Sequence, residues 1–137
     1  MAANCASGPN PYAEDETMKV LVIEDEDQLR RIVAKMLSAD GHEVIDALDG
    51  FRGMELFRKE KPDLVITDIV MPNQEGMQTI MELRRENPRI KIIAMSGSFA
   101  SSGDLDVLKM AQMLGADEII AKPFRVQELR DLVSRLH

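Results

Sequence analysis

Five short apolar runs, separated by segments in which apolar residues recur at helical spacing, limit this chain to few possible folds. Three of them, residues 20–23, 64–67 and 92–95, are almost continuously apolar and too short to make a buried helix. Runs of this kind are typical of strands that are covered on both faces of a parallel sheet. Two further segments, residues 43–47 and 119–121, complete a predicted set of five strands.

Each predicted strand is followed by a segment in which apolar residues recur every three or four positions. That spacing places them on one face of an amphipathic helix. Five β-α units in a row, joined by right-handed crossovers, predict an α/β fold with helices on both faces of a parallel sheet. The residues that mark the five helices are Leu29, Ile32, Val33, Met36 and Leu37; Phe51, Met54 and Phe57; Met77, Ile80, Met81 and Arg84; Leu105, Leu108 and Ala111; and Val126, Leu129, Val133 and Leu136.

The composition fits one globular domain without a nucleic-acid site. The chain has 137 residues, of which 45% are hydrophobic and 30% charged, as in ordinary single domains. Its 17 basic and 24 acidic residues give a net charge of −7, whereas duplex-binding domains usually carry a basic patch. The basic pairs Arg30-Arg31, Arg58-Lys59 and Arg84-Arg85 fall in predicted helices, where we expect solvated faces. We therefore expect no direct contact with nucleic acid.

Residues 1–17 are small, polar and turn-prone. They cannot bury enough apolar surface to offset their ordering entropy, so we expect a flexible leader, or an addition from the expression vector, before a folded domain over residues 18–137. No run approaches the roughly 18 apolar residues of a membrane helix, and no secretory signal opens the sequence. The expected location is the cytoplasm, without membrane contact.

Charged and hydroxyl residues follow directly after four of the predicted strands. Glu24 and Asp25 follow the first, Asp68 the third, Ser96 the fourth and Lys122 the fifth. Because the carboxyl ends of parallel strands meet at one edge of a sheet, we expect these side chains to gather there. Crowded carboxylates repel one another unless a cation lies between them, and oxygen ligands without His or Cys suit Mg²⁺. The sequence therefore predicts a magnesium site at this edge.

Asp68 is the predicted nucleophile of that edge. It ends an apolar run, so rigid backbone would hold its carboxylate in place. An aspartate that attacks a phosphoryl donor forms an aspartyl phosphate. A lysine such as Lys122 can neutralise the charge gathered during transfer, and a hydroxyl such as that of Ser96 can donate to a phosphoryl oxygen.

Four motifs stand at the predicted strand ends in chain order: Glu24-Asp25; Asp68 with Met71-Pro72 and Gly76; Ser96; and Lys122-Pro123-Phe124. Together they resemble the receiver domain of two-component response regulators, over residues 18–137. The resemblance implies a flavodoxin-like, doubly wound (βα)5 sheet of five parallel strands in the order 2-1-3-4-5. It also implies a signalling switch rather than an enzyme with turnover.

The resemblance implies a role for each site residue. Asp68 would accept a phosphoryl group from a phosphohistidine on a sensor histidine kinase or on a phosphotransfer protein. Asp25 and Asp68 would bind Mg²⁺ directly, Glu24 would hold it through water, and the backbone carbonyl of Val70 would be a further ligand.

The remaining roles concern the response to phosphorylation. Ser96 would hydrogen-bond one new phosphoryl oxygen, Lys122 would pair with another, and the peptide bond before Pro123 is expected to be cis. Ile119 stands at the switch position. The surface of the fourth helix, fifth strand and fifth helix would then change and signal to a downstream output domain or protein. A phosphorylation-dependent homodimer is a further expected state.

Three features depart from the commonest pattern of the family. Glu24 stands where Asp is more usual, and Ile119 stands where many relatives carry an aromatic ring. The chain between Ser96 and Lys122 is also longer, and we assign the extra length to the loop over residues 97–103. Phe99 in that loop is either a partner contact or folded onto the surface.

The alternative function is a Mg²⁺-dependent phosphatase of the haloacid dehalogenase type. Such enzymes need a second acid two residues after the nucleophile, where this chain has Val70. A flavodoxin-like cofactor binder would need a hydroxyl-rich loop after the first strand, where this chain has four acids, residues 24–27. Of these, Asp27 is expected to cap the first helix.

We expect no output domain within the sequence, which leaves both a stand-alone relay and a receiver cut from a longer regulator open.

Overall fold

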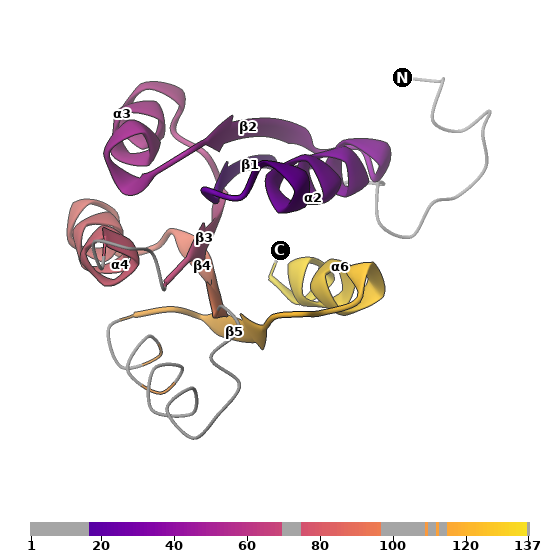
Figure 1. Cartoon of the computed structure of the whole chain (residues 1–137). Helices are drawn as coiled ribbons and strands as arrows, with labels where there is room; N and C mark the ends of the chain where they lie inside the picture. Colours follow the sequence, from indigo (N-terminus) through magenta and orange to yellow (C-terminus); the bar gives the residue numbers. More distant parts are fainter. Residues whose placement is uncertain (1–16, 70–74, 97–108, 110–111, 113–114, 137) are drawn as a thin grey trace.

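The computed structural model describes residues 17–69, 75–96, 109, 112 and 115–136 of the chain. They form one parallel sheet with helices on both of its faces (Figure 1). The order β2-β1-β3-β4-β5 confirms the predicted strand order 2-1-3-4-5. The strands are β1 (Lys19–Ile23), β2 (Glu43–Ala47), β3 (Leu64–Asp68), β4 (Lys91–Ser96) and β5 (Glu118–Ala121). The helices are α2 (Asp27–Ala39), α3 (Gly50–Glu60), α4 (Glu75–Glu86) and α6 (Val126–Arg135).

Four segments of the sequence-based prediction lie outside the described residues. They are the leader up to residue 16, the segment over residues 70–74 with Val70 and Met71-Pro72, the loop over residues 97–103 with Phe99, and most of the helix marked by Leu105, Leu108 and Ala111. Of the last segment, Lys109 and Gln112 are described, and both are helical and exposed. Among all described residues, no helix is both long and apolar enough to cross a bilayer.

The alternation of side chains along β1 shows how one sheet builds two cores. Val20 and Val22 pack with residues of α2 and α6, whereas Leu21 and Ile23 pack with residues of α3 and α4 (Figure 1). All four side chains are completely buried. Successive strand residues point to opposite faces, so a sheet that is covered on both sides needs an unbroken apolar run.

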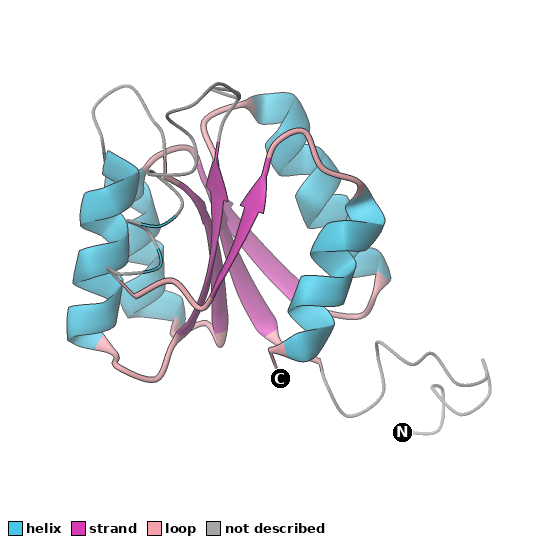
Figure 2. Ribbon diagram, turned by 90° about the horizontal axis from the view of Figure 1, so that it is seen from below, coloured by secondary structure: helices cyan, strands magenta, loops and turns pink. Residues whose placement is uncertain are grey.

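The parallel register brings the carboxyl ends of the strands to one edge of the sheet, where the arrowheads of Figure 2 point. The register pairs Ile23 of β1 with Thr67 of β3, and Ser96 of β4 with Ala121 of β5. The residues that follow these pairs are therefore close in space although they are far apart in the sequence.

In two of the basic pairs one arginine is not solvated, which corrects the sequence-based expectation for Arg30 and Arg84, whereas Arg31 and Arg85 are exposed as expected. Arg30 is only 9% exposed. Arg84 donates hydrogen bonds to the carbonyls of Pro88 and Ile90 and forms an ion pair with Asp117 at 3.0 Å. Charge alone did not identify these arginines, because a long side chain can bury its stem and bring its guanidinium to backbone carbonyls.

A tight contact between α3 and β1 generates a test of the packing. A Cβ added at Gly53 would lie 2.8 Å from Cγ1 of Ile23 and closer still to its Cδ1. We predict that Gly53→Ala lowers the free energy of unfolding by about 1 kcal/mol, because overpacking a filled core outweighs the better helix propensity of alanine. Urea denaturation measures the change.

The matched background for this substitution is Ile23→Val, which removes the Cδ1 atom. In that background Gly53→Ala should destabilise the protein less than in the parent, because the closest contact is removed although Cγ1 remains 2.8 Å away. An equal loss of stability in both backgrounds would contradict the packing described here.

Candidate functional site

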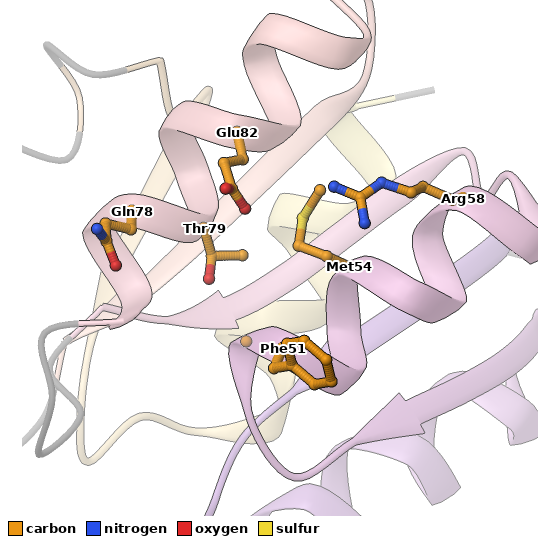
Figure 3. Close-up of a pocket in the computed structure, with 7 residues that line it drawn as sticks. Phe51, Met54, Arg58, Gln78, Thr79 and Glu82 are labelled. Atoms are coloured by element: carbon orange, nitrogen blue, oxygen red, sulfur yellow. The ribbon is translucent and has the colours of Figure 1, made fainter.

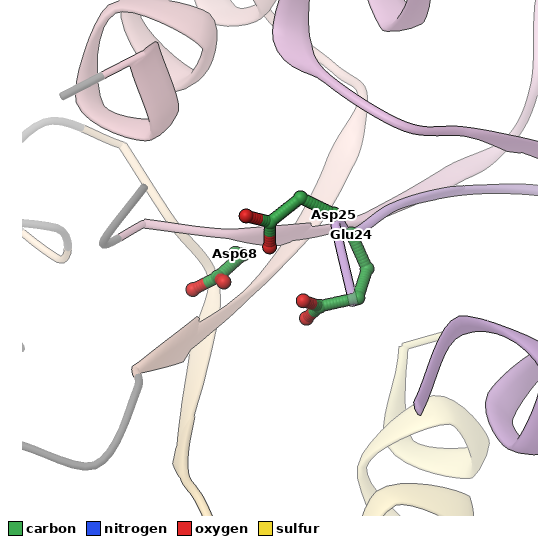
Figure 4. A group of neighbouring side chains, drawn as sticks. All are labelled: Glu24, Asp25 and Asp68. Atoms are coloured by element: carbon green, nitrogen blue, oxygen red, sulfur yellow. The ribbon is translucent and has the colours of Figure 1, made fainter. Parts of the chain in front are cut away.

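Three carboxylates meet at the carboxyl edge of the sheet and form what we call the acidic site: Glu24, Asp25 and Asp68. Glu24 and Asp25 follow β1, and Asp68 is the last residue of β3. One oxygen of each carboxylate lies within 4.8 Å of the others, and Figure 4 shows the three groups gathered around a common space. Glu24 and Asp68 are only 1% and 3% exposed, whereas Asp25 is exposed to solvent.

The side chain of Lys122 joins two of these carboxylates. Its Nζ lies 2.8 Å from Oε1 of Glu24 and 3.2 Å from Oδ2 of Asp68, and the lysine side chain is only 14% exposed. The backbone N–H of Lys122 donates to the carbonyl of Ser96 at 2.9 Å, so pairing between β5 and β4 sets the height of the lysine along the edge. The ammonium offsets one of the two buried negative charges, and Asp25 adds a third acid at the open side.

The backbone and a neighbouring amide fix Glu24 in this position. Its N–H donates to the carbonyl of Ala47 in β2 at 3.1 Å. Its carboxylate Oε2 accepts a hydrogen bond from the N–H of Glu26 at 3.0 Å, while Oε1 faces Lys122. Both oxygens of the Glu24 carboxylate are therefore hydrogen-bonded, which is what a buried acid requires.

The environment shifts the proton affinities of this pair. Burial raises the pKa of Glu24 to about 7, and the nearby Asp68 carboxylate adds to the rise, while the hydrogen bond from Lys122 offsets part of it. Burial alone would lower the pKa of Lys122, but the hydrogen bond to Glu24 and the negative charges of Asp68 and Glu24 outweigh it, so the pKa of Lys122 is raised above its ordinary value. Without a metal, the acidic site carries more negative charge than Lys122 compensates.

The acidic site fits a hard divalent cation. Three carboxylate oxygens that share one space, two of them from buried side chains, provide the oxygen ligands that Mg²⁺ takes in proteins. A bound cation would relieve the repulsion by Asp68 that adds to the effect of burial on the pKa of Glu24. The exposed side of Asp25 leaves room for water or a phosphoryl oxygen in the remaining positions.

The other residues predicted for the site lie as follows. Ser96 is the last residue of β4 and is completely buried beside this edge. Ile119 lies in β5 and packs, partly buried, on the core shared with α3 and α4. The peptide bond between Lys122 and Pro123 is cis. Val70, predicted to offer its carbonyl, lies outside the described residues.

Arg30 and Asp27 are the residues whose place the sequence-based analysis missed. Asp27 does not cap α2: the N-cap is Glu26, without a side-chain cap hydrogen bond, and the Asp27 carboxylate instead accepts from Arg30 at 2.7 Å. Arg30 also donates to the backbone carbonyl of Glu24 at 3.0 Å. Helical spacing could have indicated that Arg30 is buried. It lies three positions before Val33 and seven before Leu37, and both of these residues are buried on the same face of α2.

A pocket of about 370 Å³ lies elsewhere, between α3 and α4 (Figure 3). None of its lining residues belongs to the acidic site, so the pocket does not extend that site. The lining residues are Gly50, Phe51, Met54, Arg58, Gln78, Thr79 and Glu82.

Comparison with known proteins agrees with this architecture. A family model described as the response regulator receiver domain matches residues 20–134. The chain is 40% identical over 113 residues to the probable transcriptional regulator ycf27 of Porphyridium aerugineum, covering 81% of this chain and 44% of that protein. It is 28% identical over 117 residues to the sporulation initiation phosphotransferase F of Bacillus subtilis, covering 85% of this chain and 91% of that protein. The chain thus spans less than half the length of the first relative and most of the second.

Solved structures give the same result. A response regulator receiver domain protein from Clostridium thermocellum superposes with a TM-score of 0.78 at 32% identity, covering 86% of this chain and 92% of that one. The receiver domain of NtrX from Brucella abortus gives a TM-score of 0.78 at 28% identity, covering 85% and 96%. These matches give no support to the phosphatase alternative.

The raised pKa of Glu24 predicts how the stability of the metal-free protein depends on pH. The ordinary pKa of the group is 4.5 and its folded-state pKa is about 7, so between these values the folded state holds a proton that the unfolded state has released. The contribution of Glu24 to the free energy of unfolding is fully present below pH 4.5 and is lost as the pH rises through about 7. We predict a loss on the order of 3 kcal/mol.

Urea denaturation of the parent and of Glu24→Gln, in the presence of a chelator between pH 5 and pH 8, measures this loss. The glutamine cannot titrate, so the difference in unfolding free energy between the two proteins should change across the interval. Two curves that run parallel over the whole range would show that burial does not perturb Glu24.

Proposed function

The chain belongs to the family of response regulator receiver domains, the phosphoacceptor modules of two-component systems, and from that premise we propose that Asp68 is the residue that accepts the phosphoryl group. One oxygen of the Asp68 carboxylate attacks the phosphorus of the donor, and the bond from phosphorus to the leaving group breaks. The leaving group is the imidazole nitrogen of a phosphohistidine, or acetate when acetyl phosphate is the donor.

The observation that carries this proposal is the placement of Asp68 beside Lys122 at the end of a buried strand. Every residue of β3 is buried, so the Asp68 carboxylate is held by rigid backbone. The ammonium of Lys122 lies 3.2 Å from that carboxylate. It is therefore in place to pair with a negatively charged phosphoryl oxygen once the Asp68 oxygen has become the uncharged bridging oxygen of the acyl phosphate.

We assign the cofactor as Mg²⁺, held by Asp25 and Asp68 with Glu24 behind them, and with the carbonyl of Val70 as a further ligand. The ion would neutralise charge on the transferring phosphoryl group. The chain's own residues orient these carboxylates. Strand β3 holds the acceptor Asp68, while Lys122 and the N–H of Glu26 hold the Glu24 carboxylate.

Ser96 and Lys122 are the residues proposed to report the new phosphoryl group. Phosphorylation adds roughly −1.5 to −2 charges at this edge. Ser96 ends β4, which pairs with β5, and Lys122 directly follows β5. A displacement of either residue would therefore move β5, whose Ile120 belongs to the core shared with α6. Ile119 stands in that strand as an aliphatic residue at the switch position. The domain would then act as a switch without turnover.

The partners and setting follow from the same premise. We propose a sensor histidine kinase or a phosphotransfer protein as the donor, and an output domain or protein as the receiver of the signal. The folded unit would span residues 18–137 after a leader, work in the cytoplasm, and form a homodimer when phosphorylated. Direct contact with nucleic acid is not proposed, given the net charge of −7.

The intact mass of the protein after incubation with acetyl phosphate tests the proposal. We predict a gain of one phosphoryl group in the parent with Mg²⁺ present, and none with a chelator or in Asp68→Asn. The reason is that the amide cannot supply the attacking oxygen and the metal-free site repels the donor.

Asp131→Asn is the matched control, since Asp131 is an exposed aspartate on α6 with a hydrogen bond only to Gln127 among the described residues. It should be phosphorylated like the parent. A phosphoryl group that still appears in Asp68→Asn, or that forms equally well with a chelator, would contradict the assigned acceptor or the assigned metal.

A further inference from the structure

Arg30 connects three segments around the acidic site without belonging to it. The residue lies in the first turns of α2, and its side chain is only 11% exposed. Its Nη1 donates to the backbone carbonyl of Glu24 at 3.0 Å, and its Nη2 lies 2.7 Å from Oδ1 of Asp27. Its Nε lies 3.4 Å from Oδ2 of Asp46 in β2. One guanidinium therefore joins the loop after β1, the start of α2 and the edge strand.

The contact with the Glu24 carbonyl bears directly on Asp25. The carbonyl group of Glu24 and the N and Cα atoms of Asp25 belong to one peptide plane, which is rigid. Fixing that oxygen therefore fixes where the Cα of Asp25 stands. Within the described residues, no hydrogen bond or ion pair holds the Asp25 side chain itself, so its position depends on its backbone.

The charge of Arg30 is compensated by two carboxylates that are not part of the acidic site. Asp27 and Asp46 each place a carboxylate oxygen beside the guanidinium, and both carboxylates are partly exposed. The arginine thus brings a donor to the Glu24 carbonyl while two acids outside the site balance its charge. A bare positive charge in this place would instead repel a cation at the site.

We propose that Arg30 is a positioning residue of the acidic site, which fixes the Glu24–Asp25 peptide and thereby sets the affinity of the site for a divalent cation. The inference rests on the proposed function in taking the three carboxylates as the metal ligands. It adds a residue that touches neither the metal nor the phosphoryl group and acts only through the backbone of Asp25.

Two accounts of Arg30 predict opposite signs for the same substitution. If its charge were what mattered, Arg30→Ala would remove a positive charge close to the site and would strengthen cation binding. If it positions Asp25, the same substitution weakens binding, by about tenfold, the lower end of what loss of a supporting contact behind a metal ligand costs. The direction of the change therefore decides between them.

The experiment is a titration of metal-free protein with Mg²⁺ alone, followed by the amide chemical shifts of Asp25 and Asp68. We expect the dissociation constant of Arg30→Ala to rise about tenfold. Before any Mg²⁺ is added, the heteronuclear NOE of the Asp25 amide should also fall in the variant, because its peptide has lost its anchor. An unchanged or lower dissociation constant in Arg30→Ala would overturn the proposal.

Arg31→Ala is the matched control. Arg31 is the next residue on α2, is exposed, and has no hydrogen bond or ion pair among the described residues. It makes the same change in net charge, and we expect its dissociation constant to stay within about twofold of that of the parent, since an exposed charge is screened. A tenfold loss of affinity in this control too would assign the effect to general destabilisation of α2, since loss of a positive charge alone would strengthen cation binding, and would overturn the proposal.

Arg30→Lys keeps the proposal testable if Arg30→Ala does not fold. Lysine retains the charge and the stem, but a single ammonium cannot reach the Glu24 carbonyl and both carboxylates together. We expect weaker Mg²⁺ binding, and a parent-like value in the lysine variant would then overturn the proposal. If the parent itself bound no Mg²⁺, the metal assignment under the proposed function would fail, a result distinct from equal affinity in the parent and in Arg30→Ala.

Discussion

The ion pair that Lys122 makes with Glu24 and Asp68 is the interaction on which the rest of the site depends. It joins residues that are 98 and 54 positions apart in the sequence, at 2.8 Å and 3.2 Å. Two buried carboxylates at one sheet edge would repel each other and would cost desolvation energy without a cation between them. The ammonium can stand there only because β5 pairs with β4 in one register, with the Lys122 N–H on the Ser96 carbonyl.

This interaction connects the acidic edge to both cores of the domain. Strand β5, which directly precedes Lys122, turns Ile120 toward the core that contains Leu129 and Leu132 of α6, and it turns Ile119 toward the core of α3 and α4. Protein interiors are densely packed and yield little to displacement. The proposed movement of Lys122 toward a phosphoryl oxygen would therefore displace packed side chains on both faces of the sheet.

Much of this arrangement could be predicted from the sequence, because it follows from local pattern. Short runs of three to five residues predicted the strands, and helical spacing predicted the helices. The topology of parallel strands then placed Glu24, Asp68 and Lys122 at one edge. The strand order came from the resemblance to receiver domains, since periodicity alone does not say which strands are neighbours. The predicted ends of the strands lie within about one residue of the observed ends, which is the usual uncertainty of element boundaries.

The contacts of long side chains could not be predicted from the sequence, because they depend on which rotamer each side chain adopts in the folded domain. A basic pair in a helix was expected to be solvated, yet Arg30 shares the buried face of α2 and reaches a backbone carbonyl. For the same reason Asp27 binds that arginine instead of capping the helix. The direct contact between Glu24 and Lys122 was also not anticipated, because motif spacing assigns each residue a role toward an absent metal or phosphoryl group. It does not say how the residues satisfy one another.

The most direct test of the account is the amide spectrum of β5 and α6, recorded before and after phosphorylation by acetyl phosphate, in the parent and in Lys122→Ala. Lys91→Ala, at the exposed start of β4, serves as the lysine control. We predict that intact mass still shows one phosphoryl group on the Lys122 variant while the amides of β5 and α6 no longer shift, whereas they shift in the parent and in the control. Equal shifts in all three proteins would contradict the claim that Lys122 links the acidic edge to the rest of the domain.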